Sequence, residues 1–325
     1  MVILEAILVA EERFDGQTLK QALKSAEVLL EKRIEEINAL NVFPVPDGDT
    51  GINMYLTLQS ATAAVESLST SSVAEISAKA ARGALMGARG NSGVILSQIL
   101  RGIAKGLEMK ERISSFDFAQ ALRNASDTAY RAVTQPVEGT IITVMREASE
   151  AAIRRAERGA NLKQTMAAIV SQARNAVKRT PELLPQLKEA GVVDAGGKGL
   201  FYIFLGMKDF ISQRMTEGEE SGVSSQKAKL SKTQTSYGFD LQFLVEGDNL
   251  PLQEMRDKIS SMGESVLVVG DEHLIRVHAH TREPQAILDY GSTKGSLTDI
   301  VMEHMDEQVK TFQEARAKAK TKRGR

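Results

Sequence analysis

Two carboxylates one residue apart stand within the segment 41–54, Asn-Val-Phe-Pro-Val-Pro-Asp-Gly-Asp-Thr-Gly-Ile-Asn-Met. Its two prolines prevent a helix from continuing and its two glycines permit tight turns, so a bent loop is expected to present Asp47 and Asp49. Both cannot stay ionised in a low-dielectric pocket without a cation, because repulsion and desolvation raise a pKa. Mg²⁺ fits, since it prefers oxygen ligands and is commonly held by one or two carboxylates while phosphates complete its shell. Asn41 and Asn53 add amide oxygens.

The alternative reading of this segment is a Pro-Asp-Gly turn in which Asp49 or Thr50 caps the following helix. Helical spacing resumes at Gly51, so a helix N-terminus is expected beside the two carboxylates. The free backbone N–H groups of that terminus would meet the phosphates of a metal-bound nucleotide.

The apolar lead-in, the prolines, Asp-Gly-Asp-Thr-Gly and the following Asn resemble the nucleotide-binding loop of the dihydroxyacetone kinase L-subunit superfamily. The resemblance is strongest to the ATP-binding subunit of bacterial fatty acid kinase. It implies ATP and Mg²⁺ as cofactors, with Asp47 and Asp49 as catalytic metal ligands. It also implies a further Mg²⁺ ligand, Asn41, and three nucleotide contacts, Thr50, Gly51 and Asn53.

A glycine-rich turn at 87–93, Gly-Ala-Arg-Gly-Asn-Ser-Gly, precedes another expected helix. Small residues before a helix N-terminus are a usual solution for binding phosphate, although this is not a Walker A loop. The alternative is a plain helix connection with Asn91 or Ser92 as the N-cap. The turn resembles a segment of the fatty acid kinase family, which implies Arg89 as the cation closest to the transferred phosphate. The implied nucleotide contacts are Gly90, Asn91, Ser92 and Gly93.

Two later helix-joining segments carry further candidates. Segment 134–140 resembles the family's Pro-Val-Glu-Gly-Thr element, where Thr140 either donates its hydroxyl to phosphate or metal-bound water, or caps the next helix. In the related kinases the segment matching 191–197 closes over the nucleotide, so the resemblance implies Asp194 and Gly196 as nucleotide contacts. The alternative there is a capped entry to the last helix.

Helical periodicity explains how these segments are positioned. Eight main helices are expected, together with a short turn near 182–189, and no strand pattern occurs before residue 217. The resemblance implies a mainly α domain, residues 1–216, folded as an antiparallel eight-helix barrel. Alternate loops of such a barrel lie at one end, which would bring the four segments to one nucleotide. The expected helices are 17–39, one from 51, 73–87, 94–107, 116–133, 138–157, 162–178 and 200–214.

The composition changes after residue 216. Residues 217–236 are polar and rich in Ser, Lys, Glu and Gly, which predicts a linker. Residues 237–310 predict a small α/β domain that resembles the middle domain of the fatty acid kinase subunit, with strands at 239–245, 265–269 and 273–280 and helices at 251–262 and 284–290. The first strand is expected to be half-buried. Residues 311–325 form a basic tail, which is usually solvated and disordered, with weak attraction to anionic membrane or nucleic acid as a secondary expectation.

His278 and His280 alternate with apolar residues, so both imidazoles point to one face of a strand, a good presentation for Zn²⁺. In the family this strand is paired with a cysteine, and Asp240 occupies the matching position. Asp240, His278 and His280 therefore form a candidate zinc site, although the loss of the thiolate argues against tight structural zinc. The alternative places both histidines on a solvated face.

The composition limits the function classes. The chain has 325 residues, enough for two domains, and its 42 acidic and 41 basic residues give no field typical of nucleic-acid binding. It has no cysteine, which excludes disulfides and cysteine nucleophiles and fits the cytoplasm. The opening MVILEAILVAEE is expected to be packed structure and not a signal peptide, and no apolar run approaches the roughly 20 residues that span a bilayer.

The leading hypothesis is ATP-dependent phosphoryl transfer, and the resemblance implies a fatty acid carboxylate as the acceptor. A carboxylate needs no general base at neutral pH, which agrees with the absence of histidine before residue 273. The alternatives are a non-catalytic regulator that binds nucleotide or lipid, and a dihydroxyacetone (glycerone) kinase-type subunit. The family's chain continues with a partner-binding domain, and the basic tail favours a naturally short member. The expected partners are a fatty-acid-carrying protein and a second copy of the chain, with no membrane insertion and no nucleic acid.

Overall fold

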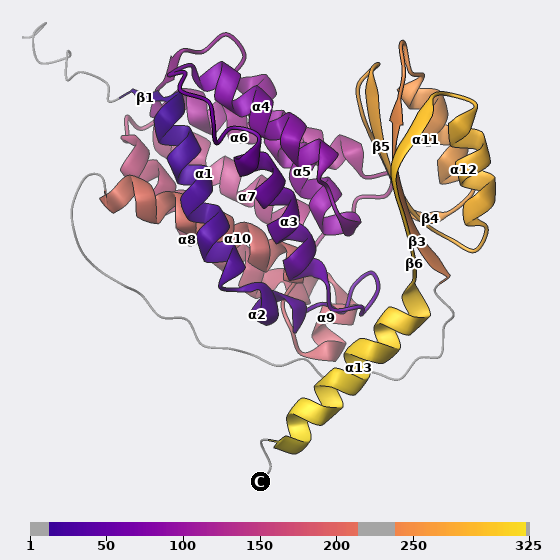
Figure 1. The fold of residues 1–325 in the computed structure, drawn as a ribbon. Coiled ribbons are helices and arrows are strands. Elements are labelled where there is room, and N and C mark those ends of the chain that lie inside the picture. The colour runs from indigo at the N-terminus through magenta and orange to yellow at the C-terminus, as the bar shows by residue number, and fades with distance from the viewer. Residues whose placement is uncertain (1–12, 214–237, 323–325) are drawn as a thin grey trace, which may run out of the picture.

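The computed structural model describes residues 13–213 and 238–322, with side chains through residue 314. A helix-rich N-terminal part is followed by a small part built on a β-sheet (Figure 1). This confirms the expected order of a mainly α part and a small α/β part. The predictions for the opening residues and for the 217–236 linker lie outside the described residues.

The N-terminal part consists of helices joined by short connections. Eight of its helices have 14 or more residues, while α2 and α9 have five and six. A two-residue strand, β1 (Phe14–Asp15), pairs antiparallel with β2 (Arg112–Ile113). The helices are α1 (Gly16–Glu31), α2 (Ile34–Asn38), α3 (Thr50–Ala63), α4 (Val73–Met86), α5 (Gly90–Gly106), α6 (Ser115–Ala132), α7 (Ile141–Ala156), α8 (Leu162–Leu183), α9 (Pro185–Ala190) and α10 (Ala195–Gln213).

Apolar side chains at helical spacing bury one continuous core between these helices. Helices α3 to α8 pack against their neighbours in sequence, and α10 packs against both α8 and α1. Leu30, Met54 and Leu58 are fully buried, and Phe201 and Phe204 are almost fully buried. The core therefore holds the ends of the helices, and the segments that join them, in fixed relative positions.

Several helix boundaries differ from the sequence expectation. The single helix expected over 17–39 breaks at Lys32 and Arg33, which separates α1 from α2. Helix α8 runs through Pro181 to Leu183, because a proline in the last turn removes only one hydrogen bond near a helix end that frays in any case. Helices α5 and α10 begin within their glycine-containing segments, at Gly90 and Ala195.

The C-terminal part is a four-stranded antiparallel sheet of order β4-β5-β3-β6 with helices on one face. Neither strand β6 nor helix α13 was predicted. Strand β6 is largely exposed and lacks a clean alternation. The elements are β3 (Phe239–Glu246), α11 (Leu252–Ser260), β4 (Glu264–Gly270), β5 (Leu274–Thr281), α12 (Pro284–Ser292), β6 (Ser296–His304) and α13 (Met305–Lys322).

The sheet is covered on both faces. Helices α11 and α12 pack on one face, and the other face lies against the helical part (Figure 1). Leu244 and Leu267 of the sheet share a cluster with Val94 and Ala132. The prediction that β3 is half-buried is therefore wrong, because the helical part covers the strand's more polar face.

The basic tail also differs from the expectation of disorder. Helix α13 continues as far as Lys322, in agreement with the high helix propensity of its Ala, Lys, Glu and Gln residues. Within residues 13–213 and 238–322, no helix combines the length and apolarity that crossing a bilayer requires.

Candidate functional site

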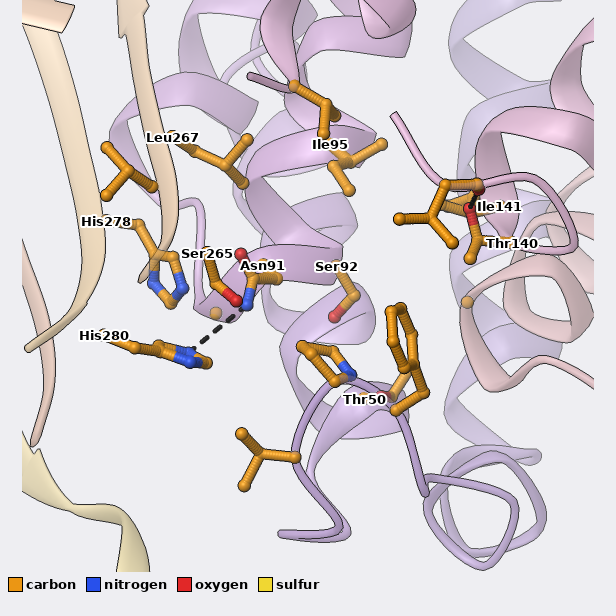
Figure 2. A pocket seen from close by; sticks show the side chains of 18 of the residues that line it. Thr50, Asn91, Ser92, Ile95, Thr140, Ile141, Ser265, Leu267, His278 and His280 are labelled. Atoms are coloured by element: carbon orange, nitrogen blue, oxygen red, sulfur yellow. Dashed lines mark hydrogen bonds between the residues drawn. The ribbon is translucent and has the colours of Figure 1, made fainter. Parts of the chain in front are cut away.

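A cavity of about 530 Å³ opens between the helical part and the sheet. Residues from the four segments singled out in the sequence line it, together with residues of β3, β4 and β5. In Figure 2, Asn91 and Ser92 of α5 and Thr50 of α3 face His278 and His280 of the sheet across this space. The four segments therefore converge, and the sheet closes the site from the other side.

Asn41 organises the loop that carries the paired carboxylates. Its Nδ2 donates hydrogen bonds to Oδ1 of Asp47 and, at 3.1 Å, to the carbonyl oxygen of Val45. Its Oδ1 accepts a hydrogen bond of 2.5 Å from the Thr50 hydroxyl. Asn41 is buried, so its amide is committed to the shape of the loop.

Helix α3 is capped from outside the loop. Asn38 Oδ1 accepts hydrogen bonds from the backbone N–H groups of Gly51, at 2.7 Å, and Ile52, at 3.3 Å. Asp49 occupies the N-cap position but makes no capping hydrogen bond with its side chain. The alternative in which Asp49 serves as an ordinary cap is thus wrong, and its carboxylate is left to the cavity.

The paired carboxylates repel one another in a poorly solvated site. Burial raises the pKa of Asp47 well above its usual range, and the neighbouring Asp49 raises it further. Burial also raises the pKa of Asp49, against hydrogen bonds from Asp47 and Asn53 that lower it. A proton or a cation shared by the two carboxylates would relieve this repulsion.

The glycine-rich turn contributes Gly90, Asn91 and Ser92 to the cavity wall. The N-cap position of α5 is Arg89, so neither Asn91 nor Ser92 caps the helix, contrary to the alternative considered above. Gly90 N–H donates to Gln242 Oε1 at 3.0 Å, and Asn91 Nδ2 lies 3.3 Å from His280 Nε2 (Figure 2). The turn is thus bonded to the sheet.

Three of the residues singled out in the sequence lie outside the cavity lining. The guanidinium of Arg89 pairs with Asp299 at 3.8 Å. Gly51 and Gly93 pack closely against α2 and α3, where a Cβ would collide with Ile34 and Thr57. These two glycines have a packing role in the structure, and the roles expected of all three residues remain predictions.

The remaining helix-joining segments place Thr140, Asp194 and Gly196 in the lining. The Thr140 hydroxyl donates to the carbonyl oxygen of Val137 at 2.8 Å and does not cap α7. Asp194 Oδ2 accepts a hydrogen bond of 2.6 Å from Gly197 N–H, as in the capped entry considered above. Burial raises the pKa of Asp194 to about 7, although backbone hydrogen bonds from Gly197 and Ile141 lower it.

Asp240, His278 and His280 lie together on the sheet, with one ligand atom of each within 4.8 Å of the others. All three are buried, which contradicts the alternative of a solvated face. His278 Nδ1 lies 3.1 Å from Asp240 Oδ1, yet neither atom makes a hydrogen bond, and His278 Nε2 also makes none. Unpaired buried polar atoms are costly, so these donor atoms fit a shared cation.

Protonation in this cluster also suits a metal. Burial lowers the pKa of His280 to about 4, so its imidazole is neutral at pH 7. Burial raises the pKa of Asp240, but His278, His280 and Gln242 together lower it, and the net pKa is lowered, which favours the carboxylate. A neutral imidazole and a carboxylate are the forms that ligate zinc.

Acidic side chains predominate in the lining of the cavity. Among the residues that the structure describes, its lining holds five carboxylates, Asp47, Asp49, Asp194, Asp240 and Glu264, and no lysine or arginine. A polyphosphate would be repelled from such a wall unless metal ions accompanied it. This arrangement separates the site from phosphate sites built on a P-loop lysine.

Sequence reasoning missed two residues that organise the site. Gln242 follows Asp240 at the spacing that puts both on one face of β3, so the alternation carried a signal for it. Asn38 lies within a helical pattern, and nothing local to it indicates that it caps a helix 12 residues later.

Comparison with known proteins gives two family matches. A family model described as the DAK2 domain matches residues 44–209, and one described as the FakA-like middle domain of fatty acid kinase matches residues 236–312.

Two relatives are similar along most of the chain. The protein YloV of Bacillus subtilis is 39% identical over 309 residues, which cover 90% of this chain and 56% of YloV. An uncharacterised protein of Staphylococcus saprophyticus is 39% identical over 316 residues, which cover 91% of this chain and 56% of that protein. The chain thus spans about half the length of these relatives.

Among solved structures, the dihydroxyacetone kinase from C. freundii in complex with AMP-PNP and Mg²⁺ aligns with a TM-score of 0.47 and 16% identity. The alignment covers 62% of this chain and 35% of that kinase.

Proposed function

Since the chain belongs to the DAK2-domain family, we propose that it is the nucleotide-binding subunit of an ATP- and Mg²⁺-dependent phosphotransferase. The observation that carries the proposal is the acidic cavity, whose lining, within the described residues, pairs two half-buried carboxylates and includes no lysine or arginine. Such a wall repels free phosphate and suits a metal–nucleotide complex. Phosphoryl transfer requires mainly positioning and charge neutralisation, which metal ions at this site supply when bound.

The residues of the loop have distinct roles in the proposal. Asp47 and Asp49 hold Mg²⁺, and Asn41 fixes the orientation of Asp47 through its amide. Thr50, Asn53, Asn91 and Ser92 present polar groups to the nucleotide from the starts of α3 and α5. Neither Asn91 nor Ser92 is used as a cap; the Ser92 hydroxyl faces the cavity, and Asn91 keeps its amide oxygen for the nucleotide while its Nδ2 lies against His280.

The proposed acceptor is a fatty acid carboxylate presented by a carrier protein. The match of residues 236–312 to the FakA-like middle domain of fatty acid kinase supports this choice. A carboxylate is ionised at neutral pH and needs no general base. The proposal therefore gives His280 no role as a base, although its imidazole is neutral and lies against the Asn91 amide.

Four further features expected from the sequence belong to this proposed function. We propose that the eight long helices among α1 to α10 form the antiparallel barrel, with α2 and α9 as short additions. The packing of α10 against α1 supports this arrangement, because it joins the last helix to the first. The protein acts in the cytoplasm, in keeping with the absence of cysteine. A fatty-acid-carrying protein docks at the mouth of the cavity, and a homodimer is the proposed oligomeric state.

We also propose that Asp240, His278 and His280 hold Zn²⁺, in support of which the buried donor atoms lack hydrogen bonds. The ion would fix the polar face of the sheet opposite the Asp loop. Elemental analysis of the purified protein is expected to find about one zinc per chain. A His278→Ala variant should lose that zinc, whereas His273→Ala, which alters an exposed histidine, should retain it.

Calorimetric titration with AMP-PNP tests the nucleotide site. We expect Mg²⁺-dependent binding by the unaltered protein and a loss of at least about tenfold in affinity for Asp47→Asn, because the substitution removes one metal-binding charge. Asp248→Asn, which alters a side chain that is 92% exposed, is the matched control. An AMP-PNP affinity that changes neither on removal of Mg²⁺ nor in Asp47→Asn would overturn the proposal.

Turnover with candidate acceptors separates the three functional classes. Acyl phosphate formed from a fatty acid carboxylate is trapped by hydroxylamine, whereas dihydroxyacetone phosphate is not. We expect trapping only when a fatty-acid-loaded carrier is present. A sugar phosphate product would favour the dihydroxyacetone kinase-type function, and nucleotide binding without turnover by any acceptor would favour a regulator.

A further inference from the structure

Helix α13 contacts the carboxylate loop, although the two are far apart in sequence. Val45 of the loop is buried against Met305 and Val309, and these three residues form an apolar cluster separate from the larger cores. Figure 1 shows α13 leaving the lower end of the sheet and passing the lower end of the helical part. The loop is thus packed from outside by a helix of the C-terminal part.

A second contact lies one turn further along α13. The ring of Phe312 lies against Gly48, between the two carboxylates, so that a Cβ at Gly48 would overlap the ring. The backbone of Gly48 has a φ angle of 78°, a conformation that residues other than glycine adopt only with strain. Glycine is therefore required here for two reasons, the backbone angle and the approach of the ring.

We propose that α13 is a positioning element for the metal-binding loop, with Met305, Val309 and Phe312 holding Asp47 and Asp49 toward the cavity. The inference rests on the proposed function insofar as the loop binds a metal–nucleotide complex. The carboxylates repel one another, so the loop needs packing to keep both in place. Asn41 supplies polar bonds within the loop, and α13 supplies its apolar support.

The arrangement also couples the loop to the sheet. Helix α13 follows directly after β6, and Met305 N–H donates to the carbonyl oxygen of Gly238 beside β3 at 3.0 Å. A shift of the sheet would therefore move the residues that pack on Val45 and Gly48. The two walls of the cavity are linked through this helix as well as through the contacts inside it.

Amide hydrogen exchange in the full chain measures the positioning without any ligand. For Phe312→Ala we expect faster exchange in peptides covering residues 41–53, because the loop loses its cover. Phe312→Leu, which keeps apolar bulk, should restore most of the protection. Gln313→Ala, which alters an exposed neighbour on the same helix, is the matched control. Unchanged exchange in Phe312→Ala would overturn the inference.

Titration with Mg²⁺ and AMP-PNP gives the functional readout. If the loop holds its binding conformation about a tenth of the time in Phe312→Ala, the affinity falls about tenfold. Failure of the unaltered protein to bind would defeat the proposed function, while the exchange experiment would still decide the inference. Binding by the unaltered protein and equal binding by Phe312→Ala would overturn the inference alone.

A double-mutant cycle tests the contact itself. Gly48→Ala should weaken binding, and in that background Phe312→Ala should cost less than it does alone, because the ring is already displaced. Additive losses in the double variant would show that the ring and Gly48 act independently, against the inference.

Discussion

Asp194 illustrates how one buried carboxylate can serve the fold at a cost that depends on pH. It accepts the N–H of Gly197 at the start of α10, and a hydrogen bond from the Ile141 backbone ties it to the start of α7. Burial nevertheless raises its pKa from an ordinary 3.8 to about 7. The folded protein therefore retains a proton there that the unfolded chain releases at lower pH.

The contribution of this proton to stability has a definite sign. It is fully present below the unfolded pKa near 3.8 and is lost as the pH rises through about 7. Asp194→Asn keeps an oxygen for Gly197 N–H but cannot ionise. We expect its free energy of unfolding to fall less than that of the parent between about pH 4 and pH 8, by on the order of 4 kcal/mol. Urea unfolding across that range measures it, with Asp289→Asn as an exposed control, and parallel curves would contradict the expectation.

The side chains predicted from the sequence divide according to the range of the interactions that place them. Asp47 and Asp49 were identifiable because their repulsion follows from a spacing of two residues. Arg89 illustrates the opposite case, since its partner Asp299 lies on another part of the chain and draws the guanidinium out of the cavity lining. A pattern within one segment contains no information about such a partner.

At the scale of the elements, the junction of α2 and α3 sets the direction of the carboxylate loop. The break after α1 turns α2 so that Asn38 Oδ1 meets two N–H groups at the start of α3. A single helix over 17–39, as expected from the apolar spacing, would give no reason for this cap. The spacing predicts that a helix exists, whereas its breaks depend on tertiary packing.

Replacing Asn38 therefore has a different effect from replacing Asp49. Asn38→Ala removes an acceptor from two helix N–H groups and should cost about 1 kcal/mol of unfolding free energy. Asp49→Asn removes no cap and relieves repulsion from Asp47, so without Mg²⁺ its stability should equal or exceed that of the parent. Chemical denaturation in the absence of Mg²⁺ compares the two. A larger loss for Asp49→Asn than for Asn38→Ala would mean that Asp49 is the working cap.

At the scale of the whole molecule, the site depends on how the sheet sits against the helices. The alternation in β3 predicted a strand with one solvated face, yet that face, with Asp240 and Gln242, closes the cavity. Alternation shows that a face is polar but cannot show whether water or another part of the protein covers it. The cluster of Asp240, His278 and His280 was therefore predicted from the sequence, but its position opposite the Asp loop was not.

Arg276 is the polar centre of this contact between the two parts. Its side chain is completely buried, donates to the carbonyl oxygens of Leu85 and Met86 at the end of α4, and pairs with Asp299 at 2.9 Å. Burial lowers its pKa, while Asp299 opposes that effect. Arginine suits the position because its planar fork reaches several acceptors at once.

Removing this guanidinium should loosen the sheet and leave the helical core folded. Arg276→Ala leaves the carbonyl groups of Leu85 and Met86 without their donor and leaves Asp299 with only the more distant Arg89 guanidinium. Because Asp299 is 35% exposed, we expect a cost below the roughly 3–5 kcal/mol that accompanies the breaking of a fully buried pair. We expect faster amide exchange at the end of α4 and along β5, and weaker Mg²⁺–AMP-PNP binding, because the turn at 87–93 begins directly after α4. Arg276→Lys should be intermediate, since an ammonium cannot reach all three acceptors, and Arg282→Ala, at an exposed position on the same part, should match the parent. If Arg276→Ala exchanged and bound like Arg282→Ala, the apolar cluster around Leu267 and Val94 would be enough to hold the two walls of the cavity together.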